Sequence, residues 1–106
     1  MKSVMTALAI TASLIVGTHA VAQPEKPTVV LVHGAFADAS SWNGVVKILE
    51  QDGYTVVAAA NPLRSVKSDG AAVSALLSSI QSPVVLVGHS YGGNVISAAA
   101  NGAVRP

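Results

Sequence analysis

Three short apolar runs constrain the fold of this 106-residue chain more than any other feature. They cover residues 28–32, 54–59 and 83–88 and are rich in valine. Apolar and polar residues do not alternate in these runs, as they would in a sheet with one face in water. Continuous apolar runs are typical of strands covered on both faces. We therefore expect a parallel sheet with helices on either side.

The segments between the runs have the spacing of amphipathic helices. Two sets of residues fall at positions i, i+3, i+4 and i+7, namely Trp42, Val45, Val46 and Leu49, and Val73, Leu76, Leu77 and Ile80. We expect the first helix to be capped by Ser40 or Ser41 and the second to start at Ser68 or Asp69. A third helix is expected from near Ser90 to a stop at Gly102. This order predicts an α/β fold with three α-β-α layers, a short parallel sheet and right-handed crossovers.

The N-terminus has the three parts of a secretory signal peptide. Lys2 precedes an uncharged, mostly apolar stretch over residues 4–17, and Ala20-Val21-Ala22 provides a small-x-small cleavage site. The stretch is shorter than the roughly 20 apolar residues that span a membrane. We therefore predict a signal peptide over 1–22, cut after Ala22, and a domain over 23–106. The protein is expected to be secreted or periplasmic, with no membrane contact after cleavage.

Composition excludes several other classes of function. The net charge is +1, which does not favour binding to nucleic acid. The chain has no cysteine, so disulfides and thiolate zinc sites are excluded. No residues have metal-ligand spacing, and residues 33–38 lack the glycine pattern that binds dinucleotides. We expect neither a metal nor a cofactor.

A G-x-S-x-G motif, Gly88-His89-Ser90-Tyr91-Gly92, follows the third apolar run and precedes the third helix. We call residues 88–92 the serine turn. A sharp strand-to-helix turn strains the serine backbone and exposes its hydroxyl above the sheet. Gly88 and Gly92 would remove collisions across the turn, and Gly93 would let the helix pack closely. The motif therefore predicts Ser90 as a nucleophile; the alternative is a turn that only connects two elements.

The first apolar run leads into a second motif, Val32-His33-Gly34-Ala35-Phe36. Acyl transfer places negative charge on a carbonyl oxygen, which two backbone N–H groups can stabilise as an oxyanion hole. We expect one donor at Tyr91, after the nucleophile, and the other at Ala35 or, one residue on, Phe36. Gly34 would let this loop bend towards the serine. His33 is expected to support the loop rather than act as a base; the alternative is an ordinary turn.

Together the two motifs resemble the α/β-hydrolase fold family. The pattern Val-Leu-Val-His-Gly-Ala-Phe-x-x-x-Ser-x-Trp at residues 30–42, followed by Val-Gly-His-Ser-Tyr-Gly-Gly at residues 87–93, is similar to small serine esterases grouped with plant methyl esterases and hydroxynitrile lyases. The resemblance covers residue 28 to the C-terminus. It implies that the first strand lies between the other two, so that Ala35 and Ser90 flank one carbonyl group. The implied function is hydrolysis of small-molecule carboxylic esters through an acyl-serine intermediate.

The base that activates such a serine is not evident. In this fold family an acid and then a histidine follow the serine, but no Asp, Glu or His follows Ser90. His19 lies in the predicted signal peptide, and His89 is adjacent to the serine, where neighbouring side chains diverge. We therefore interpret the chain as the N-terminal portion of an α/β-hydrolase domain, truncated before the acid and histidine. Such a fragment is expected to be nearly inactive and to expose the edge of the 83–88 strand.

Two alternatives stay open from the sequence: a non-hydrolytic enzyme of the same fold, such as a cyanohydrin lyase, and an inactive fragment. Gly34 stands where such lyases often carry a hydroxyl, which favours hydrolysis. The substrate and the oligomeric state are not indicated.

Several further residues have expected roles. Asp38 should be solvated at a helix start or cap it, the alternative being that it faces the pocket. Trp42 should pack in the core, the alternative being a substrate platform, and Arg64 and Lys67 should be solvated. The Phe36 and Tyr91 side chains could line a substrate pocket or lie elsewhere.

Overall fold

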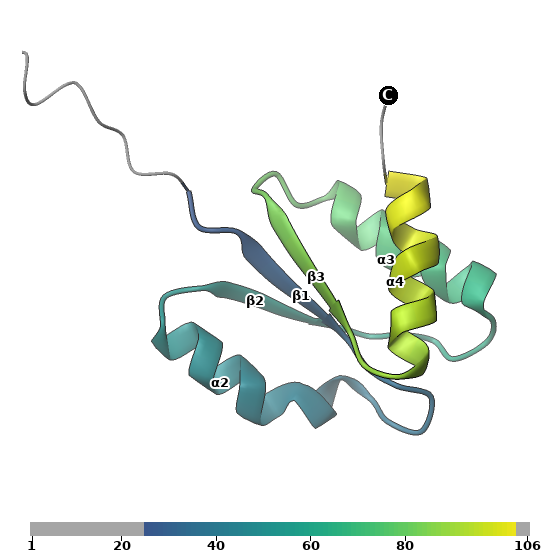
Figure 1. The fold of residues 1–106 in the computed structure, drawn as a ribbon, viewed down its shortest axis with the longest axis horizontal. Helices are drawn as coiled ribbons and strands as arrows, with labels where there is room; N and C mark the ends of the chain where they lie inside the picture. The colour runs from purple at the N-terminus through teal and green to yellow at the C-terminus, as the bar shows by residue number, and fades with distance from the viewer. Residues whose placement is uncertain (1–24, 104–106) are drawn as a thin grey trace, which may run out of the picture.

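A three-stranded parallel sheet forms the centre of the computed structural model, which describes residues 25–103 (Figure 1). The strands are β1 (Thr28–Val32), β2 (Thr55–Ala59) and β3 (Val84–Gly88), in the order β2-β1-β3. The register pairs Val32 with both Ala59 and Gly88, so all three strands end at one level. The central position expected for the first strand is confirmed. The carboxyl ends of β1 and β3 are therefore neighbours.

Helices cover both faces of this sheet. A 3-10 helix η1 (Ala39–Trp42) leads into α2 (Asn43–Gln51), and α3 (Val66–Ser78) and α4 (Tyr91–Ala103) follow later in the chain. Figure 1 shows α2 on one side of the sheet and α3 and α4 on the other. The chain moves from β1 to one edge and then crosses to the other edge, so right-handed crossovers place α2 and α3, which make these two connections, on opposite faces. The predicted three-layer α/β architecture is confirmed.

The densest packing lies between β1 and the α3–α4 layer. Its fully or almost fully buried members are Val30, Val32, Ala59, Val73, Val95 and Ala99. The opposite face is covered less completely, because α2 has no buried residue and Ile48 is 61% exposed. Val45, expected in the buried stripe of this helix, is also exposed. Among the described strands β3 lies at an edge, as predicted, and its Val85 is 46% exposed.

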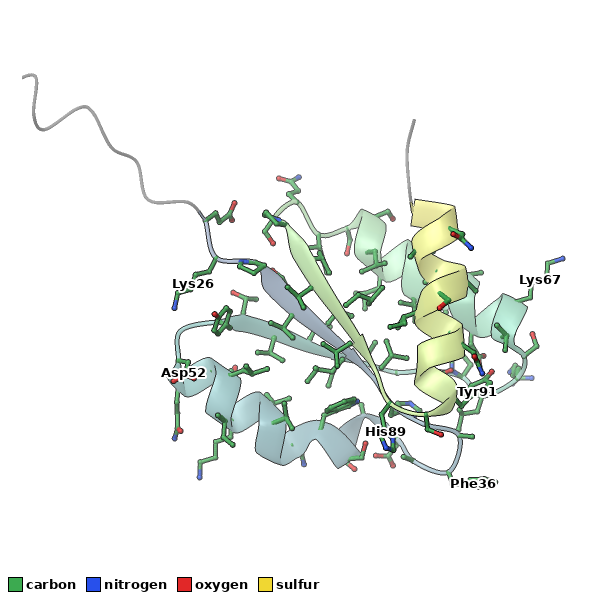
Figure 2. The ribbon with its side chains drawn as sticks, in the orientation of Figure 1. Lys26, Phe36, Asp52, Lys67, His89 and Tyr91 are labelled. Carbon is green, nitrogen blue, oxygen red and sulfur yellow. The ribbon has the colours of Figure 1, made fainter. Side chains whose placement is uncertain are left out.

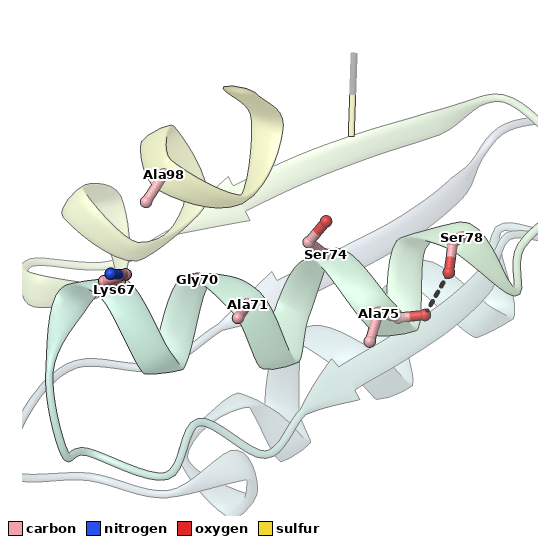
Figure 3. A pocket seen from close by; sticks show the side chains of 7 residues that line it. All are labelled: Lys67, Gly70, Ala71, Ser74, Ala75, Ser78 and Ala98. Carbon is pink, nitrogen blue, oxygen red and sulfur yellow. Dashed lines mark hydrogen bonds between the residues drawn. The ribbon is translucent and has the colours of Figure 1, made fainter. Parts of the chain in front are cut away.

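A glycine lets α3 and α4 approach closely. A Cβ built on Gly70 would lie 2.8 Å from the Cβ of Ala98, which is closer than two carbons can pack. Figure 3 shows these two residues facing each other across the helices. This contact fixes where α4 lies relative to α3, and α4 begins immediately after Ser90.

The observed helix ends differ from three predictions. The side chain of Ser65, not Ser68 or Asp69, caps α3 by accepting the N–H of Ser68. Ser40 and Ser41 lie inside η1, which Asp38 caps as expected. Asp38 and Ser65 are the caps because each has an extended backbone and a side chain that accepts an N–H of the following turn. The third helix starts at the expected place but continues through Gly102 to Ala103.

The predicted signal peptide, residues 1–22, lies outside the described residues. Its cleavage and the start of the domain at residue 23 therefore stay predictions. None of the helices over residues 25–103 is long and apolar enough to cross a membrane.

Truncation of a core side chain should be costly in so small a core. We expect Val95→Ala, at a fully buried position, to lower the free energy of unfolding by about 2 kcal/mol. The matched variant Val85→Ala, at the half-exposed edge position, should cost less than about 1 kcal/mol. Urea denaturation of the three proteins measures the difference, and equal losses would contradict this assignment of the core.

Candidate active site

The serine turn has the strained backbone that its sequence predicts. Ser90 has a φ of 54°, in the left-handed region that residues other than glycine rarely occupy. Such an outlier costs about 1–3 kcal/mol and persists only where the surroundings enforce it. The residue lies between β3 and α4 and is exposed to solvent. The chain therefore presents a serine above the carboxyl edge of the sheet.

Two glycines make this turn possible. A Cβ on Gly88 would lie 2.5 Å from the carbonyl oxygen of Gly92, and a Cβ on Gly92 would collide with the carbonyl oxygen of Val32. The steric roles predicted for these two glycines are confirmed. The role predicted for Gly93 is wrong, because a Cβ there would meet nothing within 4 Å. The close approach is made one residue earlier, at the first turn of α4.

The loop after β1 lies directly against the serine. Gly34 is buried, and a Cβ on it would lie 3.3 Å from His89 Nδ1 and 3.6 Å from Ser90 Cβ. A cavity of about 280 Å³ opens here, lined by Gly34, Ala35, Phe36, Ala37, His89 and Ser90. The structure thus brings together the two motifs that the sequence singles out. Phe36 is fully exposed at the rim and lies away from the sheet in Figure 2.

The backbone N–H groups around this cavity are available as donors. Tyr91 is the first residue of α4, so its N–H has no partner within the helix. In the described part of the chain, no protein acceptor binds the N–H of Ala35, Phe36 or Tyr91. The helix start adds a partial positive charge. The cavity is therefore suited to a developing negative charge, and the assignment of these donors to an oxyanion hole stays a prediction.

His33 is held by both of its ring nitrogens. Nδ1 donates to the carbonyl oxygen of Gly34 at 2.9 Å, and Nε2 accepts the N–H of Asn61 at 3.1 Å. These partners assign the proton to Nδ1. The ring is buried, with 2% exposure. Such an arrangement favours the predicted supporting role over that of a base.

His89 borders two hollows. Besides the cavity at Ser90 it lines a second one of about 270 Å³ with Ala37, Ser41, Trp42 and Val45. Trp42, expected in the core, is only half-buried and lines this hollow; its Nε1 is buried without a hydrogen-bond partner among the described residues. No described hydrogen bond joins the Ser90 hydroxyl to His89. The structure therefore does not pair the serine with an adjacent base.

Tyr91 makes a contact that the sequence does not predict. Its hydroxyl donates to Asp69 Oδ2 at 2.6 Å, and Asp69 Oδ1 accepts the N–H of Arg64 at 3.1 Å. Asp69 is fully buried on α3. The Tyr91 side chain thus points towards α3 and does not line the cavity at Ser90. In the sequence Asp69 looks like an ordinary acidic residue in a first helical turn, and only its tertiary partner reveals it.

The hydrogen bond between Asp69 and Tyr91 shifts the pKa of both side chains. Burial raises the pKa of Asp69, but hydrogen bonds from Tyr91, Arg64, Ser65 and Leu63 together outweigh it, so the pKa lies below its ordinary value. The hydrogen bond to Asp69 raises the pKa of the Tyr91 phenol, as does burial. Across neutral pH the pair is therefore a carboxylate accepting from a neutral phenol.

A larger hollow of about 520 Å³ lies between α3 and α4, away from Ser90 (Figure 3). Small side chains line most of it, and Lys67 is its charged member. Arg64 and Lys67 are exposed, as predicted. Over residues 25–103 no three His, Asp or Glu side chains gather in a way that could hold a metal ion. The chemically equipped cavity is the one at Ser90.

The adjacent glycines of α4 should respond oppositely to the same substitution. Gly92→Ala should displace the serine turn and lower the free energy of unfolding by about 2 kcal/mol or more, because its Cβ collides with backbone. Gly93→Ala should stabilise the protein by about 0.5–1 kcal/mol, since alanine favours the helix and open space surrounds it. Thermal unfolding compares the two, and loss of stability in both would contradict this geometry.

Removing the Asp69 carboxylate should bring the pKa of the Tyr91 phenol back towards its ordinary value. We expect Asp69→Asn to lower the pKa of Tyr91 towards 10.0, followed by the ultraviolet absorbance of the phenolate, with Tyr91→Phe identifying its signal. Because the folded-state pKa is raised, the hydrogen bond stabilises the protein fully below pH 10.0 and loses this effect as pH rises through the folded value. An unchanged phenol titration in Asp69→Asn would contradict the pairing.

Comparison with known proteins agrees with this arrangement. None of the curated proteins matches the chain. One similar solved structure is described as an extracellular alpha/beta-hydrolase from Paenibacillus species that shares structural and functional homology to Tobacco Salicylic Acid Binding Protein 2. The TM-score is 0.60 at 25% sequence identity, over 71% of this chain and 35% of that one. The chain thus spans about a third of the length of this neighbour.

Family membership rests on a longer match. The model of the alpha/beta hydrolase family matches residues 29–105, which include β1 apart from Thr28, β2, β3, the loop after β1 and the serine turn. The parallel sheet with β1 at its centre and the strained Ser90 are the corresponding structural features. The chain therefore belongs to the alpha/beta hydrolase family.

Proposed function

We propose that this chain carries the nucleophile and oxyanion hole of a hydrolase that cleaves carboxylic esters through an acyl-serine intermediate. The observation that carries the proposal is the φ of 54° at Ser90, an exposed serine beside a cavity. A connecting turn has no need of such strain at a serine, since glycine adopts this conformation without it. Strain of this kind gathers at functional sites.

The geometry supports the following reaction. The Oγ of Ser90 attacks the ester carbonyl carbon and loses its proton to a base. The carbonyl oxygen becomes an oxyanion that accepts hydrogen bonds from the N–H groups of Tyr91 and of Ala35 or Phe36, each worth about 3–4 kcal/mol in the transition state. The intermediate collapses, the alcohol leaves with a proton, and the acyl group stays on Ser90. Water then hydrolyses the acyl-serine, which releases the acid and restores the hydroxyl.

No hydrogen bond among the described residues pairs Ser90 with a base, although His89 lines the same cavity. Both nitrogens of His33 are engaged, and no Asp, Glu or His follows Ser90 in the sequence. The activity is therefore proposed for the enzyme that contains all of its catalytic groups. The chain alone is expected to turn over esters at about 10⁻⁴ of the rate of that enzyme or below.

We also propose that the protein acts outside the cytoplasm. The predicted signal peptide over residues 1–22 supports this location, and the similar Paenibacillus structure is described as extracellular.

A fluorophosphonate probe tests the nucleophile directly. In the complete enzyme it should label Ser90, located by mass spectrometry of the digested protein, and Ser90→Ala should abolish the label. Ser97→Ala, at an exposed serine later in α4, is the matched control and should leave labelling unchanged. Absence of label on Ser90 in the folded, complete enzyme would contradict the proposal.

Product analysis then separates the two reaction classes. With a nitrophenyl ester the proposed enzyme should release nitrophenol in Ser90-dependent turnover. Release of cyanide from a cyanohydrin, without ester turnover, would instead establish the lyase alternative.

A further inference from the structure

Both expected donor segments of the oxyanion hole are bonded to the same stretch of chain, the connection between β2 and α3. We call residues 60–65 the linking loop. At one end of this loop the N–H of Asn61 donates to His33 Nε2, and its Nδ2 donates to the His33 carbonyl at 3.3 Å. The His33 ring in turn donates to the carbonyl oxygen of Gly34. The peptide group that follows this carbonyl carries the N–H of Ala35.

The other end of the linking loop holds the second donor segment. The N–H of Arg64 donates to Asp69 Oδ1, and the hydroxyl of Tyr91 donates to Asp69 Oδ2. Asp69 is fully buried, so water does not compete for its oxygens. Tyr91 is also the first residue of α4, and its backbone N–H is the second expected donor of the oxyanion hole. Each expected donor segment is therefore connected to the linking loop through hydrogen bonds, which are buried at the His33 end and partly buried at the Asp69 end.

The linking loop itself is fixed in shape. Leu63 has a φ of 60°, the only such value besides that of Ser90 among the described residues other than glycine. Its N–H donates to Asn61 Oδ1 at 3.4 Å. A leucine holds this conformation only where its neighbours over-determine it. The two ends of the loop are thus linked by a short segment with little freedom.

We propose that Asn61 and Asp69 are positioning residues, which set the distance and direction between the N–H groups of Ala35 and Tyr91 by bonding their segments to one linking loop. The inference rests on the proposed function. Neither side chain contacts the cavity, so neither is assigned a chemical step. They act by preorganisation, which is the source of oxyanion-hole catalysis.

The variants are chosen to break the connection from each side. Asn61→Ala removes the bonds of the side chain to His33 and Leu63, and Asp69→Asn disturbs the bonds to Arg64 and Tyr91. Tyr91→Phe removes a single hydroxyl and serves where Asp69→Asn does not fold. Ser65→Ala is the matched control, because it removes only the hydroxyl that caps α3 and keeps the backbone bond of Ser65 to Asp69 and the side-chain bonds of Asn61 and Asp69.

The first measurement follows the amide resonances of the complete enzyme by NMR and does not depend on activity. Asp69→Asn or Tyr91→Phe should shift the amide of Ala35, on the far side of the linking loop, and Asn61→Ala should shift the amide of Tyr91. Ser65→Ala should shift neither. Changes confined to the side of the substitution would overturn the proposed connection.

The second measurement is the rate of fluorophosphonate labelling at Ser90, with kcat and KM for a nitrophenyl ester. Asn61→Ala and Asp69→Asn should each lower the labelling rate and kcat about tenfold or more, with KM nearly unchanged. Ser65→Ala should lower the melting temperature but keep labelling within about twofold. Wild-type labelling in the Asn61 and Asp69 variants would overturn the positioning role. Absence of label in the wild type, with the amide shifts present, would overturn the proposed function and leave the connection standing.

Discussion

The contact between the serine turn and the end of β1 is the constraint on which the rest of the site depends. Gly92 lies so close to the carbonyl of Val32 that no side chain fits, and the N–H of His89 donates to the same oxygen at 3.1 Å. This contact requires β1 and β3 to be neighbours that end at one level. The parallel sheet therefore fixes where Ser90 lies, and it places the loop after β1 beside it.

The helices contribute unequally to this arrangement. On one face of the sheet, α3 and α4 bury nearly all of the core, and Gly70 brings them together. On the other face α2 leaves Ile48 and Val45 exposed. The site thus lies at the start of a helix that packs into this core. Rigid support beneath a strained turn is the physical condition for keeping it strained.

Local rules were sufficient to predict the strands, the order of the elements and the serine turn, because each depends on residues close in sequence. The steric need for Gly88 and Gly92 follows from the sharpness of the turn alone, whereas Gly93 could be judged only from the space around it. The cap of α3 at Ser65 was missed because several serines compete within one turn. Asp69 was missed for a deeper reason, since its partner Tyr91 is 22 residues away and no local pattern joins them.

The conformation of Ser90 lowers the folding stability of the chain. Glycine at this position would adopt a φ of 54° without a Cβ penalty and would relieve about 1 kcal/mol of strain or more. Under the proposed function this loss of stability is offset, because a nucleophile needs the hydroxyl that glycine lacks.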